Sequence, residues 1–157
     1  MDEMINLTAL QVIKCLRTRQ ISPLEAIDAA VARISDTDRE LNALPTLCIE
    51  RARDHAKRLM ANIPKDIPRG YLFGLPIAVK DLSNVSGVRT TMGSPIYADH
   101  IPQKSSYSVQ ALEKNGAIVL AKSNTPEFGA GANTFNEVFG KTLNPWDTRT
   151  TCGGSSG

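Results

Sequence analysis

A lysine and a pair of serines occupy settings in which such side chains can carry out hydrolysis. Lys80 directly follows the short apolar run 77–79, and Ser155 and Ser156 lie in the glycine-flanked segment 153–157. Glycines let the backbone adopt unusual dihedral angles and let a substrate approach closely, and backbone N–H groups of such a loop can face developing negative charge. A lysine at the end of a strand and a glycine-flanked serine pair are two parts of a serine–lysine hydrolytic site.

Lys80 has two interpretations that the residues alone leave open. A lysine at the end of an apolar strand commonly extends its amine to water. Alternatively, the amine is a general base, which requires the uncharged form near neutral pH although free lysine titrates at about 10.4. Burial and nearby positive charges favour the uncharged amine, whereas the carboxylate of Asp81 would oppose it if that side chain pointed inward.

The serine segment has a structural alternative and one competing motif. A glycine- and serine-rich stretch at a chain end can be a flexible tail. Residues 153–157 also fit G-x-S-x-G, the nucleophile elbow of α/β-hydrolases, which requires a strand before it and a helix after it. The preceding residues 144–148 are turn-like, and both histidines, His55 and His100, precede the serine, whereas that fold places its histidine after it. We therefore reject the elbow.

Two other kinds of site are disfavoured by the sequence. Residues 77–80 resemble the V-A-I-K strand of protein kinases, but no glycine-rich phosphate loop precedes them and no H-R-D follows. The two histidines are too isolated to indicate a metal site. The three cysteines, Cys15, Cys48 and Cys152, form neither a CxxC pair nor a disulfide framework. We expect no metal, no cofactor and reduced thiols.

The overall composition is that of a soluble globular protein. The 157 residues suffice for one domain, with 41% hydrophobic and 22% charged residues. A net charge of +2, basic residues spread along the chain and an aromatic content of 5% argue against nucleic-acid binding. The sequence shows no signal-peptide pattern and no apolar run of membrane-spanning length, so we expect no membrane association and a cytoplasmic location.

The first third of the sequence is predicted to be helical. Thr8 is placed to cap a first helix. A second helix should start at residues 22–25, because Ser22 suits the N-cap, Pro23 suits the first helical position and Glu25 completes a capping box. A third helix is expected over about 46–62. The apolar positions at helical spacing are Leu10, Ile13 and Leu16, then Leu24, Ile27, Val31 and Ile34, then Ala52, Ala56 and Leu59.

The remainder of the chain predicts an α/β region. Residues 77–79 and 117–121 are short apolar runs typical of buried strands, and a helix over 105–115 lies between them. In that helix Val109 and Leu112 should point inward, with Gly116 as its stop. Strand, helix and strand predict a βαβ unit and a partly parallel sheet.

The domain organisation follows from these elements. We expect a single domain over 1–157, with a helical N-terminal region at 1–63 and the start of an α/β core at 70–157. The breaker-rich residues 64–70 read as a surface loop between them. A parallel sheet needs neighbours at its edges and cover on its faces, and so few strands predict an incomplete domain.

Five short segments resemble the amidase signature family in their order and spacing. Each segment alone is a weak indicator of the family, but five segments in the same order and at the same spacing are highly specific. They are GLPIAVKD (74–81), GVRTT (87–91), AKSNTPEF (121–128), GKTLNPWD (140–147) and GGSSG (153–157), and the similarity runs from about residue 5 to residue 157. The resemblance implies an α/β fold, with a mixed, partly parallel sheet and helices on both faces, of which this chain would form the N-terminal part.

The family cleaves carboxylic amides with a Ser–cis-Ser–Lys triad, and the resemblance assigns site residues one by one. Lys80 matches the family lysine, and Ser155 matches the bridging serine, whose preceding peptide bond is cis in the family. The implied mechanism has a neutral Lys80 accept a proton, through Ser155, from the nucleophilic serine that attacks the amide. Ser156 is implied to support the glycine-rich loop on its substrate side. The residues implied to line the substrate cleft are Gly129, Ala130 and Gly131.

The nucleophilic serine of the family lies downstream of the bridging serine, in a stretch that also supplies oxyanion-hole amides. We therefore expect these 157 residues to carry two of three triad members and to be inactive alone, as a truncated product, a partial sequence or one half of a split enzyme. The leading hypothesis is an amidase-type hydrolase of a small-molecule amide, with a second chain as the carrier of the remainder. The alternatives are the A subunit of glutamyl-tRNA(Gln) amidotransferase and a catalytically inert fragment.

Overall fold

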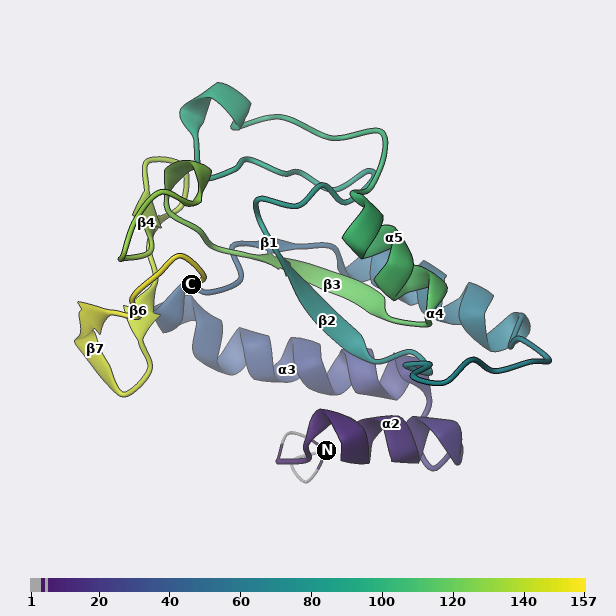
Figure 1. Cartoon of the computed structure of the whole chain (residues 1–157). Helices are drawn as coiled ribbons and strands as arrows, with labels where there is room; N and C mark the ends of the chain where they lie inside the picture. Colours follow the sequence, from purple (N-terminus) through teal and green to yellow (C-terminus); the bar gives the residue numbers. More distant parts are fainter. Residues whose placement is uncertain (1–3, 5) are drawn as a thin grey trace.

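A three-stranded sheet with helices on both faces forms the centre of the molecule (Figure 1). The computed structural model describes residue 4 and residues 6–157. The strand order is β1–β3–β2, with β1 at Thr46–Leu47, β3 at Ile118–Ser123 and β2 at Pro76–Lys80. β2 runs parallel to β3 and β1 runs antiparallel to it, so the predicted strand–helix–strand unit and the mixed sheet are confirmed.

Capping side chains begin α2 and α3 where the sequence predicts them. α2 (Ala9–Arg17) follows Thr8, whose hydroxyl accepts the N–H of the residue three positions on. α3 (Pro23–Leu41) follows Ser22, whose Oγ accepts the N–H of Glu25 at 3.2 Å, while Oε2 of Glu25 accepts the N–H of Ser22 at 2.8 Å. Each pair satisfies amides that the first turn of a helix leaves without partners.

The third helix begins later than the sequence predicts. The prediction placed it over 46–62, whereas α4 spans Ile49–Ala61 and Thr46–Leu47 form β1. A strand of two residues is too short to show an alternating pattern, so only the sheet edge that it meets distinguishes it from the start of a helix. The predicted helical region 1–63 therefore contributes a strand to the central sheet.

Two apolar clusters fill the two faces of the sheet. One lies between α3, α4 and β3, and the other lies between the sheet, the loop after β2 and α5 (Tyr107–Lys114). In Figure 1, α5 lies above the sheet and α3 below it, and this arrangement confirms the α/β fold class. Each buried Val or Ile contributes about 1.5–3 kcal/mol relative to an exposed one. The first cluster is Ile27, Ala52, Ala56, Ile118 and Leu120, and the second is Val79, Val85, Val88, Val109 and Val119.

Two apolar helix positions are less buried than the helical spacing suggests. Leu112, predicted to point inward, is 41% exposed, and Leu10 is 78% exposed. Each belongs to a short helix that needs only a narrow apolar stripe, which Leu16 and Val109 already supply. In β2, predicted to be a buried strand, only Val79 is buried. β2 lies at an edge of the described sheet, so its side chains are less covered than those of the central strand β3.

The chain after β3 is loop-rich and contains two short antiparallel strand pairs. β4 (Phe135–Asn136) pairs with β5 (Gly140–Lys141), and β6 (Leu143–Asn144) pairs with β7 (Asp147–Thr151). These pairs lie together at one end of the central sheet in Figure 1. They carry the chain from the end of β3 to the terminal glycine-serine segment.

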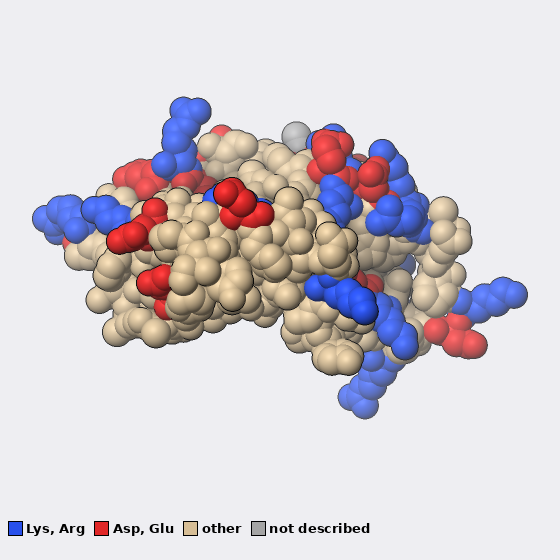
Figure 2. Space-filling model, turned by 90° about the horizontal axis from the view of Figure 1, so that it is seen from above, with Lys and Arg blue, Asp and Glu red and all other residues tan. Residues whose placement is uncertain are grey.

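The molecular surface carries charges of both signs. Figure 2 shows Lys and Arg side chains interspersed with Asp and Glu side chains around the face seen from above. Within the part of the chain that the structure describes, none of the helices has the length and apolar character needed to cross a membrane.

A half-buried charge cluster joins α4 to α5. Nη2 of Arg51 lies 2.8 Å from Oε1 of Glu113, and Nδ1 of His55 lies 3.6 Å from the same atom. Burial lowers the pKa of the His55 imidazole, Glu113 opposes this effect, and the charges of Arg51 and Arg58 add to it. The folded chain therefore favours the neutral imidazole over the charged one.

The capping box of α3 gives the first prediction. We expect Ser22→Ala to lower the free energy of unfolding by about 1 kcal/mol, because the first turn loses the acceptor for the Glu25 N–H. Urea unfolding followed by circular dichroism measures the change. Ser35→Ala, on the exposed side of the same helix, is the matched control and should stay within about 0.5 kcal/mol of the wild type. Equal losses in the two variants would contradict the role of the cap.

The lowered pKa of His55 gives the second prediction. The contribution of His55 to the free energy of unfolding should be fully present above about pH 6.5, where an unfolded histidine is neutral. It should be lost as the pH falls through the lower pKa of folded His55. His55→Gln should remove this dependence, because glutamine does not titrate. Urea unfolding at about pH 7.5 and about pH 5.5 measures it. His100→Gln is the control, and an equal loss of stability in wild type and His55→Gln would assign the effect to other groups.

Candidate catalytic site

Lys80 and Ser155 meet although 75 positions separate them in the sequence. Nζ of Lys80, the last residue of β2, donates a hydrogen bond of 2.7 Å to Oγ of Ser155, and both residues are partly buried. The peptide bond Gly154–Ser155 is cis. The same distance between the two atoms also fits the reverse hydrogen bond, in which the hydroxyl of Ser155 donates to an uncharged amine of Lys80. The structure therefore brings together the two residues that the sequence singles out for proton transfer.

Hydrogen bonds from several segments hold the loop 153–157 in place. They come from the residues that follow β3 and from the residue before β4. These contacts tie the serine pair to the body of the fold, so that the segment is not a free tail. The bonds run from the Thr134 N–H to Gly153 O (2.7 Å), from Thr125 Oγ1 to Ser155 O (3.3 Å) and from the Gly157 N–H to Asn124 O (3.2 Å).

Gly154 lies directly against the backbone of a neighbouring loop. A Cβ atom at this position would come 2.8 Å from the carbonyl oxygen of Gly131 and 2.9 Å from the carbonyl carbon of Ala132. Atoms this close clash, so the approach requires a glycine. The contact brings Gly131, one of the residues predicted to line a substrate cleft, beside the loop that carries Ser155.

Asn124 is a buried residue that ties the loops around Ser155 together. Its Oδ1 accepts the N–H of Thr125 at 2.9 Å and Nδ2 of Asn136 at 2.7 Å, and its Nδ2 donates to Oγ1 of Thr142 at 3.0 Å. The amide thus has partners on β4 and beside β6 as well as in its own loop. Removing it would leave buried polar groups without partners, which costs more than the hydrogen bonds themselves contribute.

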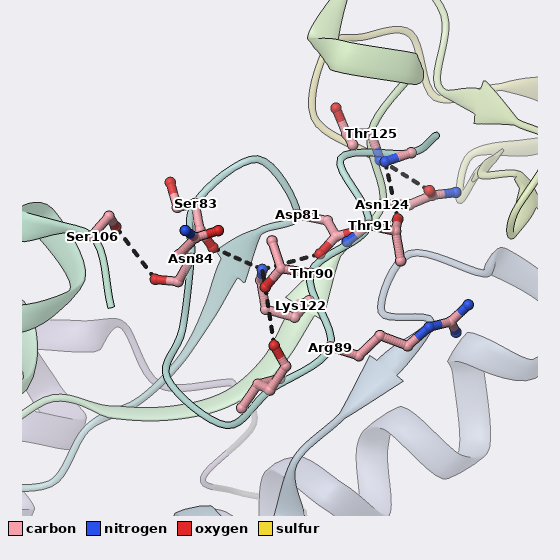
Figure 3. Close-up of polar contacts among 12 residues, drawn as sticks. Asp81, Ser83, Asn84, Arg89, Thr90, Thr91, Ser106, Lys122, Asn124 and Thr125 are labelled. Atoms are coloured by element: carbon pink, nitrogen blue, oxygen red, sulfur yellow. Dashed lines mark hydrogen bonds and ion pairs between the residues drawn. The ribbon is translucent and has the colours of Figure 1, made fainter. Parts of the chain in front are cut away.

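Asp81 and Lys122 form an ion pair that is wholly buried at the ends of β2 and β3 (Figure 3). Nζ of Lys122 lies 3.0 Å from Oδ1 of Asp81, and both side chains are 0% exposed. The ammonium also donates to Ser83 O at 2.8 Å and to Thr90 Oγ1 at 2.9 Å. Oδ2 of Asp81 accepts the N–H of Thr91 at 2.9 Å and its hydroxyl at 2.6 Å. The three donors of the ammonium and both carboxylate oxygens therefore have partners.

Lys122 was not among the site residues predicted from the sequence. Burial lowers the pKa of Lys122, while the charge and hydrogen bond of Asp81 raise it. A signal for this residue was present, because Lys122 ends the apolar run 118–121 in the same way as Lys80 ends the run 77–79. In the parallel register Val79 pairs with Lys122, which places the two lysines at the same end of the sheet.

A cavity of about 430 Å³ lies beside the residues predicted to bind substrate. Ala130 and Gly131 line it, whereas Gly129 packs against Leu82, whose Cδ1 would lie 2.6 Å from a Cβ at that glycine. Ser156 is exposed, and neither it nor the Lys80–Ser155 pair is among the lining residues. The cleft role of Gly129, Ala130, Gly131 and Ser156 stays a prediction.

Other kinds of chemistry have less support in the structure. Among residue 4 and residues 6–157, no group of three or more His, Cys, Asp or Glu side chains could hold a metal ion. The three cysteines, Cys15, Cys48 and Cys152, are free thiols. Burial raises the pKa of the Cys48 thiol and so favours its protonated form. The Lys80–Ser155 pair is therefore the strongest candidate for chemistry in this part of the chain.

Known proteins resemble this chain over nearly its whole length. A family model described as Amidase matches residues 25–157. The A subunit of glutamyl-tRNA(Gln) amidotransferase from Lawsonia intracellularis is 39% identical over 153 residues, which cover 98% of this chain and 31% of that protein.

Two solved structures show the same backbone arrangement. A protein from a study of the evolutionary origins of an s-triazine catabolic enzyme aligns with a TM-score of 0.85 and 34% identity, over 96% of this chain and 33% of its own. A bacterial aryl acylamidase of the amidase signature family aligns with a TM-score of 0.85 and 28% identity, over 96% of this chain and 31% of its own. The chain thus spans about a third of the length of the proteins that it matches.

The Asn124 contacts give a prediction for the site. We expect Asn124→Ala to lower the free energy of unfolding by about 2–3 kcal/mol, because Asn136 and Thr142 lose their buried partner. Amide hydrogen exchange in residues 153–157, read by mass spectrometry, should become faster, since this loop is attached to the same segment.

The matched control is Asn133→Ala, whose exposed side chain accepts one hydrogen bond from Thr151. It should change the free energy of unfolding by no more than about 0.5 kcal/mol and leave exchange in the loop as in the wild type. Unchanged exchange in Asn124→Ala would show that the loop is held by other contacts.

Proposed function

Because this chain belongs to the amidase family, we propose that it is part of an amidase-type hydrolase that cleaves the C–N bond of a small carboxylic amide. The observation that carries this proposal is the 2.7 Å contact between Nζ of Lys80 and Oγ of Ser155. An amine and a hydroxyl at this distance can exchange a proton directly, which is the first requirement of a serine–lysine relay.

In the proposed reaction Lys80 is the general base and Ser155 is the relay. Uncharged Lys80 takes the hydroxyl proton of Ser155, which in turn takes the proton of a nucleophilic serine. That serine attacks the amide carbonyl, the C–N bond breaks, and the relay returns a proton to the leaving amine. Water then attacks the acyl ester, which releases the acid and restores the serine. The sum is one amide and one water converted to one acid and one amine.

We propose that the nucleophile is another serine, which lies outside these 157 residues. Ser155 is already engaged with Lys80 and is needed as the relay, and its neighbour Ser156 is exposed to solvent. The chain spans about a third of the length of its relatives, so we place the nucleophile and the oxyanion-hole amides in the remaining part of the fold. That part belongs either to the same polypeptide or to a second chain.

A second candidate function is favoured by the curated relative. The similarity to the A subunit of glutamyl-tRNA(Gln) amidotransferase extends over nearly all of this chain. In an amidotransferase the same lysine and serine would cleave an amide so that its nitrogen is transferred to an acceptor. Release of ammonia from simple amides without a partner favours the hydrolase, and activity only with glutamyl-tRNA(Gln) and partner proteins favours the amidotransferase. The cytoplasmic location expected from the sequence stays a prediction.

The proposed function is tested by ammonia release from simple amides. We expect no turnover by residues 1–157 alone, because the proposed nucleophile lies outside them. We expect turnover when the same residues are fused to the remaining two thirds of a structurally similar amidase. In the fusion, Lys80→Ala and Ser155→Ala should each reduce kcat/KM by about 10³-fold or more.

Lys114→Ala is the matched control, because this lysine is exposed at the end of α5, and it should leave kcat/KM unchanged. Circular dichroism of each fusion protein establishes that it is folded. Turnover that survives Lys80→Ala in the fusion would remove the proposed base. Turnover by residues 1–157 alone that Lys80→Ala abolishes would place the nucleophile within this chain.

A further inference from the structure

The sequence places a carboxylate directly beside the proposed base. Asp81 follows Lys80, and its side chain is 0% exposed. A buried carboxylate next to a lysine would normally stabilise the charged ammonium, which cannot accept a proton. If the amine of Lys80 is to act as a base, the carboxylate of Asp81 must therefore pair with a different group.

Both oxygens of the Asp81 carboxylate accept hydrogen bonds, which come from Lys122 and Thr91. Oδ1 accepts from Nζ of Lys122, and Oδ2 accepts twice from Thr91. The amine of Lys80 donates its hydrogen bond to Ser155 instead. Two lysines at the same end of the sheet thus have different partners, one a carboxylate and the other a hydroxyl.

The backbone around Asp81 keeps its side chain in this orientation. The Asp81 N–H donates to Ser123 O at 3.1 Å, and the Asp81 carbonyl accepts the Met92 N–H at 3.0 Å. The side chain then lies among the loop residues seen in Figure 3, where Lys122 also contacts Ser83 and Thr90. Lys122 supplies the positive charge in contact with Asp81, so the buried carboxylate depends on it.

We propose that Lys122 is a positioning residue for the Lys80–Ser155 pair. Its ammonium pairs with the carboxylate of Asp81, so that the amine of Lys80 is hydrogen-bonded to Ser155 and not to Asp81. Without Lys122, the carboxylate is a buried, unpaired charge whose nearest cationic neighbour in sequence is Lys80. The meaning of this arrangement for catalysis rests on the proposed amide hydrolysis. The coupling among Asp81, Lys122 and Lys80 is a property of this chain alone and can be measured without turnover.

The test is the rate at which acetic anhydride acetylates Lys80 at neutral pH in the 157-residue chain, read by mass spectrometry. This reagent reacts with uncharged amines only. We expect Lys122→Met to slow acetylation of Lys80 by about tenfold, because the unpaired carboxylate of the adjacent residue Asp81 would favour the charged form of the Lys80 amine. Adding Asp81→Asn to that variant should return the rate to within about twofold of the wild type, since the released charge is gone.

Asp81→Asn alone is an independent arm of the same experiment. Because Asp81→Asn leaves the Lys122 ammonium without its carboxylate partner at the same end of the sheet, this variant should not slow acetylation of Lys80. If Lys122→Met does not fold, Lys122→Gln takes its place with the same expectation, since it keeps a polar side chain but not the charge. The exposed Lys114 in each sample is the internal standard for the reagent, and circular dichroism of each variant establishes that it is folded.

Two results would overturn the proposal. One is acetylation of Lys80 that is as fast or faster in Lys122→Met and Lys122→Gln than in the wild type, which a merely structural role of Lys122 predicts because the loop loosens. The other is a double variant, Lys122→Met with Asp81→Asn, that acetylates Lys80 as slowly as Lys122→Met alone, which would show that the slowing does not come from the charge of Asp81. Failure of the fusion protein to hydrolyse amides would leave these rates unchanged, so the two proposals fail separately.

Discussion

The buried ion pair between Asp81 and Lys122 is the interaction on which the candidate site depends. Moving two charges out of water costs several kcal/mol for each ion, and their attraction offsets that cost only when the remaining hydrogen bonds are satisfied. Here the ammonium has three oxygen partners and the carboxylate has three donors, which come from the residue after β2, from β3 and from the segment between Ser83 and Thr91. Because every member of this network has a partner, the network holds the ends of both strands together.

The Lys80–Ser155 pair lies next to that ion pair along the chain. β2 and β3 are parallel, so their carboxyl ends meet at one edge of the sheet and both deliver a lysine there. Lys122 points into the polar cluster, while Lys80 reaches the loop that carries Ser155. Asn124, immediately after β3, anchors that loop from the same edge, and the close approach of Gly154 to Gly131 sets its distance from the neighbouring loop. The site is therefore held in place without a regular element on its serine side.

Local signals were sufficient for some parts of the fold and not for others. The starts of α2 and α3 could be predicted, because a cap involves residues three positions apart. β1 could not be predicted, since two residues carry no period and the strand exists only through its pairing with β3. The partial exposure of β2 likewise depends on its place at the edge of the described sheet, which a run of apolar residues does not encode.

The same distinction holds for the site. Lys80 and Ser155 could be named from their settings and from the family resemblance, whereas the direction of the Asp81 side chain is decided by residues in other segments. Lys122 was overlooked because a buried lysine is rare without a partner, and its partner is 41 positions away.

The central claim is that an uncharged amine at Lys80 accepts the proton of the Ser155 hydroxyl. Neutron diffraction from deuterium-exchanged crystals near neutral pH observes these protons directly. We expect two deuterons on Nζ of Lys80 and the hydroxyl deuteron of Ser155 on the line between Oγ and Nζ. Three deuterons on Nζ, with one of them directed at Oγ, would contradict the claim.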